Sequence, residues 1–385
     1  MISLASPPLS TASRPDVVIP FTELSLQWRE IEAKALADIH RLFHDSSFCL
    51  GPFVEQFEHA VGHYLGIEHA VGVNSGTSAL HLALIAAGVG PGDKVLVPTL
   101  TFVATAWAVL YVGATPVFCD VEDASANIDV ADAERRLDSA VKAIIPVHLY
   151  GQPSDMPGVM AFAARHRLTV IEDAAQAIGA RLAGRCVGTF GLCGCFSFYP
   201  AKNLGAAGEA GLVVTADARL ARRLRALRHH AQTERYLHAE LGFNYRMDGF
   251  QGLVLSHKLP LLDRWTELRR KLARTYNQRL AGLPLTLPQI THQDHVFHLY
   301  VVRSDARDRL RRYLQQAGIE TGLHYPVPLH AQPALTRFVN DRDTFPVADR
   351  YARECLSLPL FTGMTEGQID RVCETIHGFF PYATK

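Results

Sequence analysis

The sequence predicts an α/β protein in which a large domain with a mainly parallel sheet precedes a smaller C-terminal α/β domain. The chain has 385 residues, which allows two or three folded units at roughly 150 residues each. From about Asn74 to Thr215, helical patterns alternate with short apolar runs, as in parallel sheets whose strands are joined by helices. After the segment GLPLTLPQ the order of elements changes, which indicates a second, smaller unit.

In the large domain the predicted helices and strands follow one another at short intervals. Helices are predicted at TSALHLALIAA, at ATAWAVLYVG and near Met156 to Arg165. From Asp217 to about Leu280 helical sequence dominates, and ARLARRLRALRHH places leucines on one stripe and arginines elsewhere, which predicts a connector out of this domain. The predicted strands are the apolar runs KVLVP, TPVFCDV, KAIIPVHL, LTVIED, CFSFY and GLVVT.

The smaller domain follows with a different order of elements. It begins with a predicted strand and helix, and it ends with a helix that starts at Thr365. Its segments are a strand at HVFHLYVVRS, a helix at ARDRLRRYLQQAG, an extended HYPVPLH and a short strand at CLSLPL. We therefore divide the chain into an N-terminal arm (1–25), a large domain (26–258) and a small domain (259–385).

The composition excludes several classes of protein. Hydrophobic residues make up 48% and charged residues 20% of the chain, which is typical of a globular protein. Lys and Arg (38) balance Asp and Glu (38), so no overall positive charge attracts nucleic acid or anionic lipid. No apolar run reaches the roughly 20 residues of a membrane-spanning helix. Because a secretory signal is also missing and the seven cysteines are odd in number, we expect a soluble, cytoplasmic protein.

The segment from Asn74 to Leu80 places glycine and hydroxyl residues where a helix is predicted to begin. A helix start offers unpaired N–H groups and the positive end of the helix dipole, and both suit a phosphate. Taken alone, the segment is better explained by simple N-capping through Ser75 or Thr77.

Asp173 ends the predicted buried strand LTVIED. Ligands of open α/β sheets bind at the carboxyl ends of the strands, so this carboxylate is placed to hold a cationic group. Capping of the following AAQAIGA segment explains Asp173 equally well. Gln176 shares a helical face with Asp173 if the turn continues.

Lys202 follows the predicted strand CFSFY, in which Ser197 and Tyr199 lie on the same face. A lysine near buried surface loses part of its preference for the charged form, which makes its amine nucleophilic towards a carbonyl. Taken alone, Lys202 is better explained as a solvated loop lysine.

Together, these three fragments are the parts that hold pyridoxal 5'-phosphate. The helix start binds the phosphate, Lys202 forms an imine with the cofactor aldehyde, and Asp173 keeps the pyridine nitrogen protonated. The ring then accepts electrons when a substrate amine loses its α-proton, and the freed lysine moves that proton as general base and acid.

Seven longer motifs occur in the order NSGTSAL, PTLTFVATAWAV, PVHLYGQPSDM, VIEDAAQAIGA, FSFYPAKNLGAAGEAG, GFNYRMDGFQ and HYPVPLH. In these motifs and in their order, the sequence resembles the DegT-type (DegT/StrS) family of nucleotide-sugar aminotransferases. The similarity extends from about residue 20 to the C-terminus. It implies the type I fold of the pyridoxal-phosphate-dependent (PLP-dependent) transferases.

The resemblance also implies the residues that bind the cofactor. Lys202 matches the imine-forming lysine, and Asp173 matches the partner of the pyridinium nitrogen. Asn244 matches an asparagine that reaches the cofactor phosphate of the neighbouring subunit, which implies a homodimer with shared active sites. The other matches are Gln176 near the phenolic oxygen, Phe102 stacked on the ring, and Gly76, Thr77 and Ser197 at the phosphate. For Phe102, core packing is the alternative.

Residues that match positions around the sugar or its diphosphate are Tyr199, His324 and Tyr325. Arg246 and Arg235 are additional candidates, because guanidinium groups suit phosphate oxygens. His324 and Tyr325 are explained equally well as hydrogen-bonded polar residues at a domain junction.

From the resemblance we expect an enzyme that moves an amino group from glutamate to a keto group of a nucleotide-linked deoxysugar. Lys202 acts in both halves of such a ping-pong reaction. HYPVPLH and Tyr199 favour a sugar substrate, including one with a 3-keto group. Two alternatives stay open: an aminotransferase for a keto-cyclitol of an aminoglycoside-type pathway, and a PLP-binding regulator without turnover. Lys202, Asp173 and Asn244 together disfavour the regulator, because a pure binder needs no proton shuttle.

Other patterns are assigned to structure rather than to chemistry. Cys193 and Cys195, with Cys186 and the histidine pair at 229–230, do not have the spacing of a zinc site, so no metal is predicted. The basic ARRLRALRHH is interpreted as a solvated helix face rather than a DNA-reading helix. Glu172 is not paired with its neighbour Asp173 as in a glycosidase, because adjacent strand residues point to opposite sides.

Overall fold

The computed structural model describes residues 18–289 and 294–380. Within these residues the largest sheet has seven strands. Six of them run in one direction, and β9 alone is antiparallel to its two neighbours. The predicted, mainly parallel sheet is therefore confirmed. The order across the sheet is β1 (His69–Val73), β9 (Gly211–Thr215), β8 (Cys193–Ser197), β5 (Thr169–Asp173), β4 (Val141–Ile144), β2 (Lys94–Pro98) and β3 (Thr115–Cys119).

Side chains alternate along these strands, and helices cover both faces of the sheet. Val95 and Val97 of β2 belong to a core with helices α3, α4 and α7, whereas Leu96 between them packs with α5 and α6 on the other face. Phe196 of β8 packs on that second face with α2 and α8. The helices are α2 (Pro52–Leu65), α3 (Gly76–Ala86), α4 (Ala104–Tyr111), α5 (Val130–Arg135), α6 (Met156–His166), α7 (Ala218–Leu227) and α8 (Gly249–Lys258).

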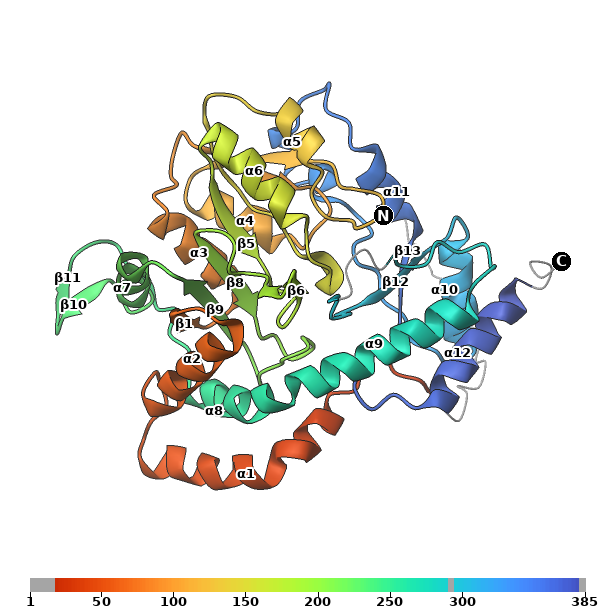
Figure 1. Cartoon of the computed structure of the whole chain (residues 1–385), viewed down its shortest axis with the longest axis horizontal. Helices are drawn as coiled ribbons and strands as arrows, with labels where there is room; N and C mark the ends of the chain where they lie inside the picture. The colour runs from red at the N-terminus through yellow and green to blue at the C-terminus, as the bar shows by residue number, and fades with distance from the viewer. Residues whose placement is uncertain (1–17, 290–293, 381–385) are drawn as a thin grey trace, which may run out of the picture.

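Helix α9 (Leu262–Arg279) connects the large sheet to a small two-stranded sheet (Figure 1). Leu272 and Tyr276 of α9 lie in one core with the small sheet and with helices α10 and α12. The side chain of Thr365 caps α12, so the predicted start of the last helix is confirmed. These elements are β12 (Tyr300–Arg303), β13 (Cys355–Leu358), α10 (Arg307–Gln316), α11 (Pro346–Glu354) and α12 (Glu366–Phe379). The domain division after residue 258 stays a prediction.

Helices α7, α8 and α9 make up most of the chain from Asp217 to Leu280, so the prediction that helical sequence dominates there is confirmed, but a hairpin interrupts it. Helix α7 is followed by an exposed antiparallel hairpin of β10 (Gln232–Glu234) and β11 (Leu237–His238), and only then by α8 and α9. An exposed hairpin buries no side-chain stripe, so its sequence lacks the periodicity that separates strands from helices.

Further elements lay outside the patterns assigned from the sequence. The main one is α1 (Ser25–His44), which packs against α8. The others are β1, α2, α5, α11, β6 (Arg181–Leu182), β7 (Arg185–Cys186) and the short 3-10 turns η1 (Leu149–Gly151), η2 (Leu259–Leu261), η3 (Leu329–Ala331) and η4 (Thr336–Phe338). Residues 1–17 of the predicted N-terminal arm lie outside the described residues, whereas the backbone of Ile19 pairs with Gly318 and Glu320, which follow α10. None of the described helices has both the length and the apolar character needed to cross a membrane.

Candidate active site

The carboxyl ends of β1, β5 and β8 lie at the edge of a cavity of about 650 Å³. One wall comes from the large sheet and its loops, and the other comes from the segment around Phe21, from α9 and from the small sheet. This is the position at which open α/β sheets bind ligands. The cavity brings together ten of the residues singled out from the sequence, namely Gly76, Thr77, Phe102, Asp173, Gln176, Ser197, Tyr199, Lys202, His324 and Tyr325.

Asp173 contributes a buried carboxylate to this cavity, with 5% of the residue exposed. Thr105 Oγ1 donates to Asp173 Oδ2 at 2.8 Å, and the N–H of Ala175 donates to Oδ1 at 3.1 Å. Burial raises the pKa of Asp173, while these hydrogen bonds and the positive charge of Lys202 act against the rise. The chain after Asp173 forms turns rather than a helix, so Asp173 and Gln176 share no helical face, whereas the bond from Ala175 shows that Asp173 does cap the start of the AAQAIGA segment.

Glu172 points away from the cavity, as strand alternation predicts. Its carboxylate accepts hydrogen bonds from the backbone N–H groups of Gly188, Phe190 and Gly191 at 2.7, 2.6 and 2.7 Å. His148 Nε2 lies 3.1 Å from the same carboxylate. Glu172 is therefore part of the scaffold behind Asp173, and the interpretation that the two carboxylates are not a catalytic pair is confirmed.

Lys202 lies half-buried on the cavity wall, in a turn five residues after the end of β8. Its backbone N–H donates to Tyr199 O at 2.8 Å. Burial lowers the pKa of the Lys202 ammonium to about 8, and the negative charge of Asp173 opposes this effect. A larger share of the amine is thus neutral and nucleophilic than in a solvated lysine. The alternative of a solvated loop lysine was wrong.

Helix α8 fixes the loop that carries Lys202. Lys258 Nζ donates to Gly205 O at 2.7 Å, and Gln251 Oε1 accepts from the N–H of Ala207 at 3.0 Å. Both side chains are buried, at 6% and 8% exposure. The loop is therefore held by its backbone on a rigid element, which limits where the Lys202 amine can move.

The start of α3 forms the opposite part of the cavity. Ser75 Oγ accepts from the N–H of Ser78 at 3.1 Å, which confirms N-capping by Ser75. The N–H groups of Gly76 and Thr77 have no carbonyl partner within the helix, as at every helix start. A Cβ atom on Gly76 would lie 2.7 Å from Ser197 Cβ. Glycine therefore lets the Ser197 hydroxyl approach the helix start, and the three residues form a cradle suited to an anion.

Gln176 and Tyr325 join the two walls of the cavity. Gln176 Oε1 accepts from the N–H of Tyr150 at 2.7 Å, and its Nε2 donates to the Tyr325 hydroxyl at 3.0 Å. Burial raises the pKa of Tyr325. Phe102 has 54% of its surface exposed and lies with its ring centroid 6.0 Å from that of Tyr325. Core packing of Phe102 was therefore wrong, because the ring faces the cavity.

His324 and Tyr199 also line the cavity. His324 Nδ1 lies 2.8 Å from Ser357 Oγ, and its ring stacks on Phe21 with centroids 5.7 Å apart. Burial and the charge of Lys202 lower the pKa of His324 to about 4, so its imidazole is neutral near neutral pH. Tyr199 exposes 51% of its surface at the cavity.

Asn244 and Arg246 do not line the cavity of their own chain. Asn244 is exposed, and its backbone pairs with that of His229. Arg246 Nη1 donates to His229 Nδ1 at 2.9 Å. Arg235 lies on the exposed hairpin next to the Tyr236 ring. The chain after the hairpin runs beside the end of β1, where Val73 pairs with Arg246, and this path keeps the three side chains off the cavity wall.

Two basic residues on the cavity wall were missed by the sequence analysis, Arg269 and His298. Arg269 Nη1 donates to the backbone oxygens of Phe297, His298 and Leu360 at 3.2, 3.4 and 3.0 Å. Burial lowers the pKa of Arg269 to about 10, and burial together with the charges of Lys202 and Arg269 lowers the pKa of His298. Arg269 lies in a helix rich in exposed arginines, so only its place on the buried stripe with Leu272 and Tyr276 distinguishes it.

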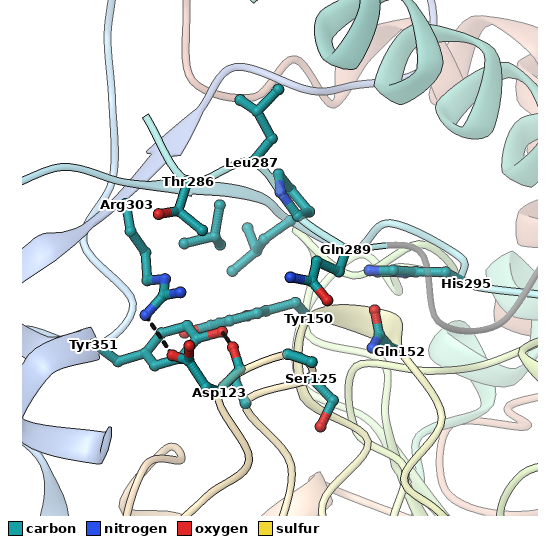
Figure 2. A pocket seen from close by; sticks show the side chains of 15 residues that line it. Asp123, Ser125, Tyr150, Gln152, Thr286, Leu287, Gln289, His295, Arg303 and Tyr351 are labelled. Carbon is teal, nitrogen blue, oxygen red and sulfur yellow. Dashed lines mark hydrogen bonds and ion pairs between the residues drawn. The ribbon is translucent and has the colours of Figure 1, made fainter. Parts of the chain in front are cut away.

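A second, much smaller pocket lies where the small sheet meets the large domain (Figure 2). Arg303 Nη1 donates to Asp123 Oδ1 at 2.7 Å, and the Tyr351 hydroxyl donates to Asp123 O at 2.7 Å. Its volume of about 30 Å³ has room for about one water molecule. The cavity that contains Asp173 and Lys202 is the candidate active site because of its lining residues, and the contacts in Figure 2 join the two parts of the chain that form its walls. In the described ranges, no group of three or more His, Cys, Asp and Glu side chains is placed to hold a metal ion.

Comparisons with known proteins agree with this geometry. A model of the DegT/DnrJ/EryC1/StrS aminotransferase family matches residues 29–377. The UDP-N-acetyl-3-dehydro-alpha-D-glucosamine 3-aminotransferase of Acidithiobacillus ferrooxidans is 46% identical over 369 residues, which cover 94% of this chain and 99% of that protein. The crystal structure of Streptomyces venezuelae DesV with a ketimine intermediate is 42% identical, with a TM-score of 0.91 and 96% and 99% of the two chains covered. NtdA of Bacillus subtilis with bound cofactor PMP is 30% identical, with a TM-score of 0.89 and coverage of 96% and 86%.

Proposed function

Because the chain belongs to the DegT/DnrJ/EryC1/StrS aminotransferase family, we propose that it transfers an amino group from glutamate to a keto group of a nucleotide-linked deoxysugar. The observation that carries this proposal is the meeting of Lys202 and Asp173 in one cavity at the strand ends. The name of the Acidithiobacillus relative specifies a 3-dehydro sugar linked to UDP. This similarity favours a 3-keto group as the acceptor.

The residues of the cavity fit pyridoxal 5'-phosphate. Gly76, Thr77 and Ser197 would hold its phosphate, because the helix start offers N–H donors and the missing Cβ of Gly76 leaves room beside Ser197. Asp173 would hold the ring nitrogen, since a cation next to this buried carboxylate offsets the desolvation that raises its pKa. Lys202 would bind the aldehyde carbon through Nζ. The bound cofactor supplies the electron sink that lets a substrate amine lose its α-proton.

The protein's own groups then perform the steps around the cofactor. Lys202 Nζ would take the α-proton from the donor and would then give a proton to the carbon of the cofactor's aldehyde group. Its pKa of about 8 permits both transfers near neutral pH. Phe102 and Tyr325 cover the ring region and exclude water. Gln176, which is fixed by Tyr150 and Tyr325, offers an amide hydrogen to the phenolic oxygen. Tyr199 and His324 are placed to bind the sugar.

We also propose that Asn244 and Arg246 act in the cavity of a second copy of the chain. Asn244 is exposed and lies outside the cavity of its own chain. A homodimer in which each copy supplies these residues to its partner's cavity accounts for that position, and twofold pairing is the commonest arrangement of homodimers.

The proposal is tested with the variant Lys202→Ala and a panel of 3-keto nucleotide sugars. The assay follows release of 2-oxoglutarate from glutamate. We expect Lys202→Ala to abolish transfer while circular dichroism shows an unchanged fold, because no other amine lines the cavity within the described residues. Lys142→Ala, which removes an amine bonded at the surface to Asp93, is the control and keeps the activity of the parent.

Other results would point to the alternatives. Amination of a keto-cyclitol but of no keto sugar would replace the sugar proposal with the cyclitol one. A protein that binds the cofactor but converts neither substrate class would be a PLP-binding regulator. Parent-level transfer by Lys202→Ala would contradict the role of Lys202.

A further inference from the structure

The cavity wall on the side of the small sheet has a chemistry of its own. We call it the small-domain wall, and it consists of Phe21, Arg269, His298, His324, Leu358 and Leu360. Its members come from the first described segment, from α9 and from the chain around β12 and β13. Apolar side chains thus surround one guanidinium and two imidazoles.

Arg269 brings a positive charge to this wall that no carboxylate balances. The residue is 4% exposed, and the hydrogen bonds of its guanidinium within the described chain go to backbone oxygens rather than to a carboxylate. Its Nη1 is bonded to three backbone oxygens, whereas its buried Nε has no hydrogen-bond partner. A buried, unbalanced charge is unfavourable. A bound anion would therefore find a strong partner here.

His298 lies within electrostatic reach of both Arg269 and Lys202, because both charges lower its pKa. Its Nδ1 is buried and has no hydrogen-bond partner in the described structure. A neutral imidazole with a free nitrogen adds hydrogen-bonding capacity next to the guanidinium without adding charge. His298, His324 and Lys202 line the same cavity, and burial together with the charge of Lys202 lowers the pKa of both imidazoles.

The acidic groups of the cavity belong to the opposite side. Asp173 and Glu209 are both part of the large domain, as is the helix start that suits the cofactor phosphate. The small-domain wall carries no carboxylate, and Leu358 and Leu360 are 1% and 5% exposed. A ligand group that matches this wall is a carboxylate attached to a short apolar chain.

We propose that the small-domain wall binds a carboxylate of the amino donor, with Arg269 and His298 as the residues that select a dicarboxylic amino acid. The inference rests on the proposed aminotransferase function and assigns a separate subsite to its donor. The guanidinium provides the charge, His298 provides a further hydrogen bond, and Phe21, Leu358 and Leu360 cover the methylene groups. After the keto acid formed from the donor has left, the nucleotide sugar occupies the part of the cavity towards Tyr199.

The test separates the two halves of the reaction in the cofactor-loaded enzyme. Glutamate alone is mixed with the enzyme, and the change in cofactor absorbance is followed without any sugar. In Arg269→Met and His298→Leu, we expect the glutamate concentration at half-maximal rate to rise by about tenfold to a hundredfold, because each loses a hydrogen bond to a charged group. The reaction of the aminated enzyme with its keto substrate should keep the KM of the parent.

A binding measurement gives a readout that does not depend on turnover. Glutarate has both carboxylates of glutamate but no amine, and its affinity for the cofactor-loaded enzyme is measured by calorimetry. We expect the two variants to bind glutarate about tenfold or more weakly than the parent. Arg270→Met is the matched control, because Arg270 is the next residue of α9, also donates to a backbone oxygen, at His295, and does not line the cavity.

Unchanged glutarate binding in both variants would overturn the inference. Equal losses in both half-reactions would do the same, because they would indicate a structural role for these side chains. If Arg269→Met does not fold, His298→Leu decides, and His298→Gln should restore part of the glutarate affinity by supplying an N–H donor. If the donor half behaves as expected but no keto sugar or cyclitol is aminated, the acceptor proposal fails and the donor subsite stands.

Discussion

Burial shifts the pKa values of two lysines of this protein in the same direction, although the contacts of the two side chains differ. The pKa of Lys202 and the pKa of Lys258 are both lowered to about 8 by burial. Lys202 faces Asp173 across the cavity, whereas Lys258 lies behind the active-site loop and donates to Gly205 O. The first amine is positioned for chemistry. The second holds the backbone that carries the first.

Lys258 should make the stability of the protein depend on pH. Its pKa falls from the ordinary 10.5 to about 8, so between these values the unfolded chain binds more protons than the folded chain, and stability rises with pH. In Lys258→Met this contribution is missing. We expect the difference in unfolding free energy between parent and variant to shift by about 2 kcal/mol in favour of the parent from about pH 8 to about pH 9.5.

Urea unfolding of the cofactor-loaded proteins at the two pH values measures this shift. Lys142→Met, at an exposed lysine, controls for the loss of a lysine as such. A difference between parent and Lys258→Met that stays constant with pH would show that folding does not lower the pKa of Lys258.

The sequence identifies some single residues of the site better than others. Lys202 and Asp173 lie at or near strand ends within long motifs. Their residue types suit cofactor binding, and strand ends are where ligands bind, so both signals point to the same residues. Arg269 and His298 were missed because they lie in a helix and an apolar run that are regular in pattern. Their role depends on contacts between segments distant in the sequence, such as that of Arg269 with Leu360. Periodicity within one segment carries no information about such contacts.

Among the helices, α3 has the start that matters most for binding. Its first residue, Gly76, lies so close to Ser197 that a Cβ atom would be 2.7 Å from Ser197 Cβ. Real Cβ atoms do not approach so closely, so a larger residue must move Ser197 or tilt the helix start. Both changes displace the groups proposed to hold the cofactor phosphate.

We therefore expect Gly76→Ala to weaken cofactor binding by about tenfold or more, which corresponds to an overpacking cost of about 1–3 kcal/mol. The measurement is the cofactor absorbance retained after dialysis against a series of cofactor concentrations. Gly90→Ala is the matched control, because the nearest atom to its new Cβ would be Val112 O at 4.0 Å. Equal affinity of Gly76→Ala and the parent would show that the phosphate is bound elsewhere.

The elements of the sheet were predicted more completely than those around it. Strands such as KVLVP and GLVVT were recognised because they are apolar on both faces, as buried parallel strands are. Strand β1 and helices α1 and α2 precede the range in which the alternation was recognised. The hairpin after α7 was missed for a different reason. Its residues are exposed, so their hydropathy shows no alternation from which strands could be predicted.

For the molecule as a whole, the exposed position of Asn244 leads to a prediction about mixed dimers. Lys202→Ala and Asn244→Ala are each expected to be inactive or weakly active. If Asn244 serves the partner's cavity, a hybrid dimer of the two variants contains one cavity with both residues intact. Mixing and refolding the two proteins should then restore transfer activity well above that of either variant alone.

The same experiment has a clear opposite outcome. If Asn244 serves its own cavity, no hybrid cavity contains both residues, and mixing gives only the average of the two parent variants. Separately tagged subunits allow the hybrid to be purified and its rate of 2-oxoglutarate release to be compared directly with those of the two parents.

The architecture as a whole could be predicted, whereas the arrangement of the cavity could not. Alternating strands and helices predict a mainly parallel sheet, and the change of order after GLPLTLPQ (282–289) indicates a second unit. The junction between the units depends on individual pairs such as Arg303 with Asp123, which are 180 residues apart (Figure 2). Both partners are charged residues of a kind that is common on surfaces, so neither is marked in the sequence as an interdomain contact.

The two-sided cavity also bears on how such enzymes can be diversified. The groups proposed for the cofactor come from residues 75–202, and those proposed for the donor come mainly from residues 269–360. A chimera that exchanges the second stretch for that of a relative should inherit a new nitrogen source while retaining its coenzyme. Recombination near α9 would thus let donor choice evolve independently of the reaction chemistry.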